Sequence, residues 1–153
     1  MNDNPLALHA QNLLEIAETA YLTTIDRCER PQTRAMFNLR NRAQFPNLHS
    51  FFAGAHTPYE TWFTTNTSSS KMLDLAENRA VSVYYCLPSQ FRGLMLGGDM
   101  EIVDAPVEKA LLWQEGWELY YPLGPEDPDY ILLRLRPNSV KYFHQLQRAV
   151  LVG

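Results

Sequence analysis

The stretch of residues 61–85 constrains the fold most, because it predicts a strand, a polar turn, a short helix and a second strand in direct succession. Trp62 and Phe63 favour a strand, and Ser68 or Ser69 can cap the helix that follows. The apolar side of that helix would be formed by Met72, Leu73, Leu75 and Ala76. The turn between the first strand and the helix is therefore the place where chemistry is expected.

The same turn has the composition of an anion-binding site. Its hydroxyl groups, the free N–H groups of the helix start and the ammonium of Lys71 would converge at one helix N-terminus, as in many phosphate sites. Serine runs are also ordinary loop and capping material. The turn alone leaves both interpretations open.

Most of the remaining chain predicts strands joined by short polar turns. The predicted strands are residues 21–26, 33–39, 94–103, 130–136 and 139–143, and a late helix is predicted over 106–118. Gly97 and Gly98 indicate a bulge or a close backbone approach within the long strand. This order favours a mainly β fold, a small antiparallel barrel with a few peripheral helices.

Residues 5–19 predict an amphipathic helix, with Asn4 as its cap and Pro5 at its first position. Its apolar face, expected to pack on the sheet, contains Leu6, Ala10, Leu13, Ile16, Ala17 and Ala20. Residues 41–60 mix Pro, Gly and Asn with aromatic residues without a regular period, so this segment is the hardest to predict.

Composition sets the frame for the function. A chain of 153 residues with 46% hydrophobic residues predicts one compact domain over residues 1–153. A net charge of -4 gives no basic field to attract nucleic acid or an anionic membrane. Cys28 and Cys86 form no CxxC pair, which suits a reduced compartment. Without a membrane-length apolar run or a signal-like N-terminus, we expect a soluble cytoplasmic protein.

Three segments carry a family pattern when they are taken together: RPQTRAMF, FTTNTSSSKMLDLAENRAVSVYY and GLMLGGDMEIVD. Their order resembles the FMN-binding split-barrel superfamily typified by pyridoxamine 5'-phosphate oxidase. The shared order is an arginine-bearing strand, a strand ending near Thr-Asn, a Ser-x-Lys turn, a short helix and a strand leading to glycine. The tail WELYYPLGPEDPDYILLRLRP is similar to the general stress protein 26-like branch. The resemblance covers residues 19–143 and implies an antiparallel split β-barrel.

The resemblance also implies an FMN site. In that family the arginine and the Ser-x-Lys turn hold the phosphate, the next strand end lies beside the ribityl chain, and the isoalloxazine lies against the arginine strand. The corresponding positions here are Arg34, Ala35, Met36, Phe37, Thr64, Thr65, Ser69, Ser70 and Lys71. A guanidinium, an ammonium and helix-start N–H groups supply what a dianionic phosphate needs. Arg34 also has an ordinary interpretation as an exposed strand residue, and its apolar neighbours suit any core strand.

The chain departs from the oxidase itself at three places. Ser70 stands where the family turn often has an arginine, so one phosphate cation is missing. The glutamine near the flavin ring corresponds to Gly93, and the C-terminal Trp and Arg motif has no counterpart in NSVKYFHQLQRAVLVG. We therefore expect little or no pyridoxamine 5'-phosphate oxidase activity and leave the catalytic residues unassigned.

Other residue groups predict ordinary structure. His9, His49, His56 and His144 lack partners at metal-ligand spacing, so we expect no metal site. The aromatic residues Trp113, Trp117, Tyr120 and Tyr121 favour a core or a dimer interface over a cofactor site. Glu126, Asp127 and Asp129 favour a solvated turn, because prolines separate them.

Two functional hypotheses remain. The first is a homodimeric flavoprotein with FMN at the subunit interface, acting as an oxidoreductase on an unidentified small molecule, with a stress-related role. The second is a non-enzymatic protein of the same fold that binds or stores flavin, deazaflavin or haem. Fold does not decide between them, because the sequence shows no general acid, base or nucleophile.

Overall fold

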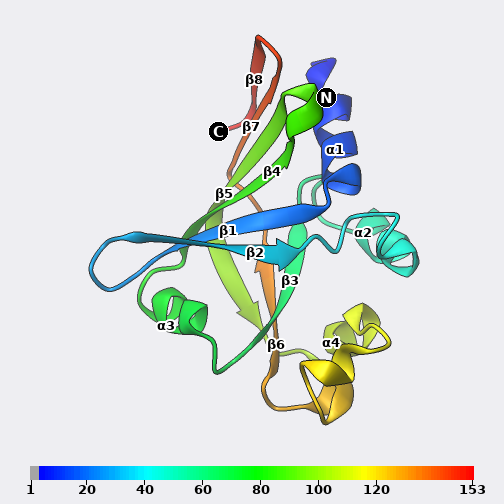
Figure 1. Cartoon of the computed structure of the whole chain (residues 1–153), viewed down its shortest axis with the longest axis vertical. Helices are drawn as coiled ribbons and strands as arrows, with labels where there is room; N and C mark the ends of the chain where they lie inside the picture. Colours follow the sequence, from blue (N-terminus) through cyan, green and yellow to red (C-terminus); the bar gives the residue numbers. More distant parts are fainter. Residues whose placement is uncertain (1–3) are drawn as a thin grey trace.

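Eight antiparallel strands form one sheet in the computed structural model, which describes residues 4–153 (Figure 1). The strands are β1 (Thr19–Ile25), β2 (Pro31–Phe37), β3 (Thr61–Asn66), β4 (Ala80–Leu87), β5 (Arg92–Val103), β6 (Tyr130–Leu135), β7 (Ser139–His144) and β8 (Gln147–Val152). Their order is β2-β1-β4-β5-β6-β3, and β7 and β8 extend the sheet from β5. The helices are α1 (Leu6–Ile16), α2 (His49–Ala53), α3 (Ser70–Glu77) and α4 (Pro106–Leu112). The predicted mainly β architecture is confirmed.

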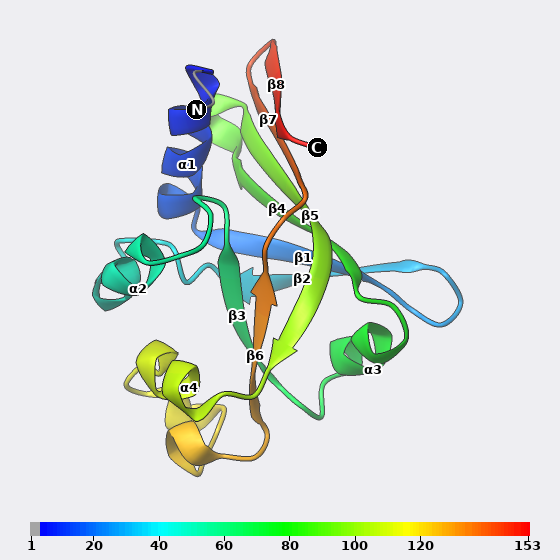
Figure 2. The ribbon, with the colours of Figure 1, turned by 180° about the vertical axis from the view of Figure 1, so that it is seen from behind.

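The long strand β5 curls this sheet. Its first part pairs with β4 and β7, whereas residues 100–103 pair with β6, and Figure 2 shows it passing between the two regions. A Cβ at Gly98 would lie 3.2 Å from Leu135 and 3.4 Å from the backbone of Pro137. The predicted close approach is therefore found where the chain leaves β6. The curl brings the two end strands, β2 and β3, into contact.

The larger core lies between α1 and the inner face of the sheet. Ala7, Ala10, Leu13 and Leu14 of the helix are buried against strand residues such as Leu22, Val83, Leu94 and Leu133. Asn4 caps the helix as predicted, because its Oδ1 accepts a hydrogen bond from Leu6 N at 3.0 Å. Ile16 was expected on the apolar face but is 42% exposed, since the buried face includes Leu14 instead.

A second core lies between β3, β6 and the segments around α2 and α4. It contains Leu39, Phe45, Leu48, Phe52, Trp62, Leu112, Trp117, Tyr121, Tyr130 and Leu132. Phe45, Leu48 and Phe52 belong to the segment without a regular period, which is ordered by this packing and not by a local pattern. Within residues 4–153, no helix has the length and apolar character needed to cross a membrane.

Two elements differ from the sequence prediction. The late helix was expected to reach residue 118, but α4 ends at Leu112, and the chain continues through the 3-10 turns η3 (Trp117–Leu119) and η4 (Gly124–Glu126). Gly116 adopts a φ of 91°, which a right-handed helix cannot contain. The second difference is β8, which was not predicted and forms a hairpin with β7. Two further 3-10 turns, η1 (Pro46–Leu48) and η2 (Pro88–Gln90), connect other elements.

Asn38 fixes the end of α1 to the strand region. Its Nδ2 donates to Leu14 O at 2.7 Å and to Ala17 O at 2.8 Å, and its side chain is buried. We predict that Asn38→Ala lowers the free energy of unfolding by about 1–3 kcal/mol, because the Leu14 carbonyl loses its side-chain donor, whereas Ala17 O keeps the hydrogen bond from Asn41 Nδ2 at 2.9 Å. Urea unfolding measures this as a lower midpoint with an unchanged slope. The exposed Asn47→Ala is the control, and an Asn38→Ala loss no larger than the control's would contradict the assignment.

Candidate functional site

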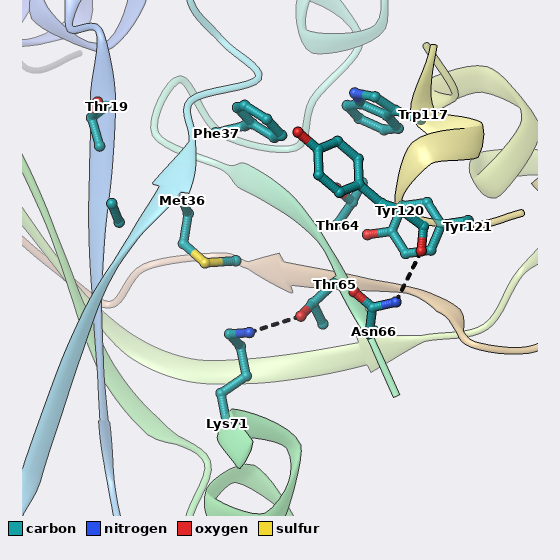
Figure 3. Close-up of a pocket in the computed structure, with 11 residues that line it drawn as sticks. Thr19, Met36, Phe37, Thr64, Thr65, Asn66, Lys71, Trp117, Tyr120 and Tyr121 are labelled. Atoms are coloured by element: carbon teal, nitrogen blue, oxygen red, sulfur yellow. Dashed lines mark hydrogen bonds between the residues drawn. The ribbon is translucent and has the colours of Figure 1, made fainter. Parts of the chain in front are cut away.

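A cavity of about 340 Å³ lies where the curl brings the two end strands together. Its lining comes from β1, β2, β3, α3 and the segment after α4. The lining residues are Thr19, Ala35, Met36, Phe37, Thr64, Thr65, Asn66, Lys71, Trp117, Tyr120 and Tyr121 (Figure 3). The volume lies within the range of about 300–1,000 Å³ that is usual for small-molecule sites. The fold therefore places a ligand-sized cavity in the split between its end strands.

One end of the cavity is polar: Thr65 and Lys71 line it, and Ser69 contacts Thr65. Lys71 Nζ donates to Thr65 Oγ1 at 2.9 Å, and Thr65 Oγ1 lies 3.3 Å from Ser69 Oγ. Ser69 is at the N-cap position of α3, as predicted, but its side chain makes no capping hydrogen bond. Hydroxyls, an ammonium and the start of a helix thus converge, which is the arrangement that binds anions.

Arg34 stands directly behind this polar end. Its Nη1 donates to Thr24 Oγ1 at 2.7 Å, and its Nη2 lies 3.6 Å from Asp74 Oδ2. Thr24 Oγ1 in turn donates to the same Asp74 oxygen at 2.7 Å. Burial, followed by the charge of Arg34, lowers the pKa of Lys71. Two cations therefore share this region with one carboxylate close behind them.

The opposite end of the cavity is an aromatic wall formed by Phe37, Trp117, Tyr120 and Tyr121 (Figure 3). Phe37 stacks on Trp117 with ring centroids 6.2 Å apart and planes at 11°. Tyr120 meets Phe37 edge-on at 6.1 Å. Trp117 and Tyr121 are buried, whereas Phe37 and Tyr120 remain nearly half exposed. The wall therefore offers flat apolar surface together with phenolic hydroxyls.

The structure unites most of the residues that the sequence singled out. Six of them line this cavity: Ala35, Met36, Phe37, Thr64, Thr65 and Lys71. Ser69 touches the cavity through Thr65, and Arg34 lies one layer behind. Ser70 instead lines a separate depression with Asp26, Arg27 and Asp74.

Sequence reasoning missed part of the lining. Thr19 carried no distinguishing signal, Asn66 counted only as part of the Thr-Asn strand end, and the residues of the aromatic segment favoured a core or interface. Trp117 and Tyr121 do belong to the second core, but they also line the cavity. Gly116 and Pro122 were the available signal, since both interrupt a helix and let the segment fold back over β3.

Burial of the charged Lys71 side chain should lower the stability of the folded protein by a measurable amount. Because the pKa of Lys71 is lowered in the folded protein, the unfolded chain binds more protons between that pKa and the ordinary lysine value of 10.5. At pH 7 the Lys71→Met variant should therefore melt at a higher temperature than the wild type. This difference should shrink as the pH rises toward 10.5, because the wild type then loses the charge that destabilises it. Thermal unfolding of the unliganded protein at pH 7 and pH 10 tests this. Arg79→Met, which removes an exposed cation, is the control, and a lower melting point for Lys71→Met at pH 7 contradicts the prediction.

Comparison with known proteins agrees with this architecture. The model of the family described as "Pyridoxamine 5'-phosphate oxidase like" matches residues 9–153. A Clostridium acetobutylicum protein related to general stress protein 26, of the pyridoxinephosphate oxidase family, has a TM-score of 0.74 and 28% identity, covering 95% of this chain and 92% of that one. General stress protein 26 from Bacillus anthracis has a TM-score of 0.71 and 19% identity, covering 95% and 98%.

The fold also recurs with different ligands. A pyridoxamine 5'-phosphate oxidase-related, FMN-binding protein from Nostoc punctiforme has a TM-score of 0.58 and 17% identity, covering 96% of this chain and 88% of that one. Similar folds occur in an F420 reductase, at a TM-score of 0.56, and in a haem-binding protein from Mycobacterium smegmatis, at 0.70. No curated protein matches the chain. The family match spans nearly the whole chain, and the chain therefore belongs to the pyridoxamine 5'-phosphate oxidase-like family of split-barrel proteins.

Proposed function

We propose that this protein is a flavoprotein that binds FMN in the cavity between β2 and β3. The observation that carries the proposal is the pairing of a cationic hydroxyl-lined end with an aromatic wall in one cavity. FMN has the same two-part chemistry, a dianionic phosphate and a planar ring, joined by a polar chain. Family membership supports a flavin at the coarse level.

The residues present fit the phosphate. Lys71 would give a charge-assisted hydrogen bond, and the hydroxyls of Thr65 and Ser69 together with N–H groups at the start of α3 would add neutral donors. Arg34 would contribute mainly through its charge, because Thr24 and Asp74 already engage its guanidinium. In this scheme the Ser70 side chain has no contact role, since Ser70 lines the separate depression.

The remaining lining fits the ring and the chain that joins it to the phosphate. Ala35, Met36 and Phe37 would present strand backbone to the ring, and Thr64 would lie beside the ribityl chain. When bound, the flavin supplies hydride or one-electron transfer, while the protein binds, orients and shields it. Among the described residues, no acidic or histidine side chain lines the cavity. That lining gives no general acid or base apart from Lys71 and the tyrosines.

This lining is also compatible with the second hypothesis, in which the protein is a non-enzymatic carrier of flavin, deazaflavin or haem. Such a carrier needs binding groups but no proton-transfer groups.

Pyridoxamine 5'-phosphate oxidation is disfavoured in either case. A side chain at Gly93 would run into the Tyr84 hydroxyl and the Phe143 ring, so this position has no room for the oxidase glutamine. The C-terminal residues form the β7–β8 hairpin.

A second copy of the chain is the partner we propose for the outer face of the sheet. Tyr21, Tyr84, Met95, Lys141 and Val150 align in one row across five strands. A groove of about 380 Å³ runs through this region, and Val150 is 66% exposed. Tyr21 is also paired with Ala35, which lines the cavity, so the face is continuous with the site. A homodimer across this face would place a partner beside the bound flavin.

A negative charge introduced in the middle of this row should prevent the two copies from associating. We predict that the wild type is a dimer at micromolar concentration and that Met95→Glu is a monomer, because burying a carboxylate at the interface costs more free energy than an ion pair with the neighbouring Lys141 returns. Sedimentation velocity with FMN present measures both. Val107→Glu, on an exposed position of α4, should remain dimeric. A monomeric wild type would contradict this proposal.

The phosphate assignment predicts a graded loss of affinity. Lys71→Ala should weaken FMN binding by about 1.5–3 kcal/mol, which is roughly tenfold to more than a hundredfold, because a charge-assisted contact is lost. Arg34→Ala should act in the same direction. Riboflavin, which lacks the phosphate, should bind both variants as it binds wild type. Quenching of flavin fluorescence measures each affinity, with exposed Arg79→Ala as the control. Unchanged FMN affinity in both variants would show that the phosphate lies elsewhere.

A further inference from the structure

The carboxylate of Asp129 receives an unusual number of hydrogen bonds from the turn between β3 and α3. Asn66 Nδ2 donates to it at 2.7 Å, Thr67 Oγ1 at 2.7 Å, Ser68 N at 3.0 Å and Ser68 Oγ at 3.2 Å. The Asp129 carbonyl also accepts Thr67 N at 2.8 Å. The side-chain donors Thr67 and Asn66, followed by Ser68 N, lower the pKa of Asp129 to about 2. The carboxylate therefore stays charged at neutral pH.

Asp129 is itself held firmly from the other side. Its N–H donates to Asp127 Oδ1 at 2.9 Å, and the other oxygen of Asp127 accepts Leu123 N at 3.0 Å. Asp127 is buried, and Tyr130, the residue after Asp129, begins β6. Asn66 Nδ2 also reaches the Tyr120 carbonyl at 3.3 Å. The turn and the aromatic wall are thus fastened to the same point of the sheet.

The turn leads directly into the polar end of the cavity. Ser69 N donates to Asn66 O at 3.0 Å, and Ser69 and Lys71 both meet Thr65. Thr and Ser side chains can bond their own backbone in several alternative ways, so a hydroxyl-rich turn has competing conformations. By accepting both hydroxyls and the amide, Asp129 selects one of them. Asp129 does not line the cavity, so it acts through these neighbours.

We propose that Asp129 is a positioning residue that holds the Asn66–Ser69 turn in the conformation in which Ser69 and Lys71 can bind the phosphate. This inference rests on the proposed FMN function. Its consequence runs against simple electrostatics. Removing a negative charge near an anion site should by itself strengthen anion binding, whereas loss of a positioning residue should weaken it. The sign of the change therefore separates the two roles.

The test is Asp129→Asn, with the exposed Glu126→Gln as a control that removes a carboxylate from the same turn. We expect the Kd for FMN to rise by about tenfold or more in Asp129→Asn, on the scale of one lost charge-assisted hydrogen bond. The Kd for riboflavin should stay within about threefold, because a general loss of structure would move both ligands together. In a Lys71→Ala background the same substitution should have a smaller further effect, because only its route through Ser69 remains.

Two more measurements test the inference, and the second of them needs no bound cofactor. Thr67→Val combined with Ser68→Ala removes donors from the other side of the contact and should weaken FMN in the same direction. In the unliganded protein, amide hydrogen exchange over residues 66–71 should accelerate in Asp129→Asn and not in Glu126→Gln. Unchanged or tighter FMN binding by Asp129→Asn, or unchanged exchange, overturns the inference. A wild type that fails to bind FMN, with exchange accelerated as expected, overturns the proposed function and leaves the turn assignment standing.

Discussion

The two-sided pairing of β5 is the constraint on which the site depends. One continuous strand hydrogen-bonds to β4 and β7 along most of its length and to β6 at its end. A flat sheet would leave β2 and β3 far apart as its two edges, exposed to further pairing. The change of partner along β5, from β7 to β6, turns those edges toward each other, and Gly98 allows the close approach of the chain that connects β6 to β7. The cavity is the space that remains between them, which explains why its lining comes from distant parts of the sequence.

Charge inside this space links stability to binding. Lys71 and Arg34 repel each other and are partly withdrawn from water, and Asp74 offsets only one of them. The empty site is therefore electrostatically unfavourable for the folded state. An anion that neutralises the pair removes that cost, so ligand binding should stabilise the fold beyond the contacts it forms. The same reasoning explains why hydroxyl donors that carry no charge, Thr65 and Ser69, accompany the lysine.

Much of this arrangement was predictable from local pattern. The strand, turn and helix over residues 61–85 follow from side-chain character, and the family resemblance assigned β2, β3 and the turn to one site. What escaped prediction depended on tertiary contacts. Phe45 and Phe52 gain their roles only by packing on β3 and β6, and Tyr120 reaches the cavity because the chain breaks at Gly116. β8 was missed because its residues find a partner only after β7 has formed. Asp129 resembled a solvated turn residue because its donors lie far away in the sequence.

The most direct test of the central claim is absorption spectroscopy of the purified protein titrated with FMN, riboflavin, F420 and haem under identical conditions. If the cavity binds FMN through its phosphate and ring together, FMN will produce saturable, shifted flavin bands at lower concentration than riboflavin. Equal binding of FMN and riboflavin would contradict the role of the polar end. Saturation by haem or F420 without any response to FMN would contradict the choice of cofactor.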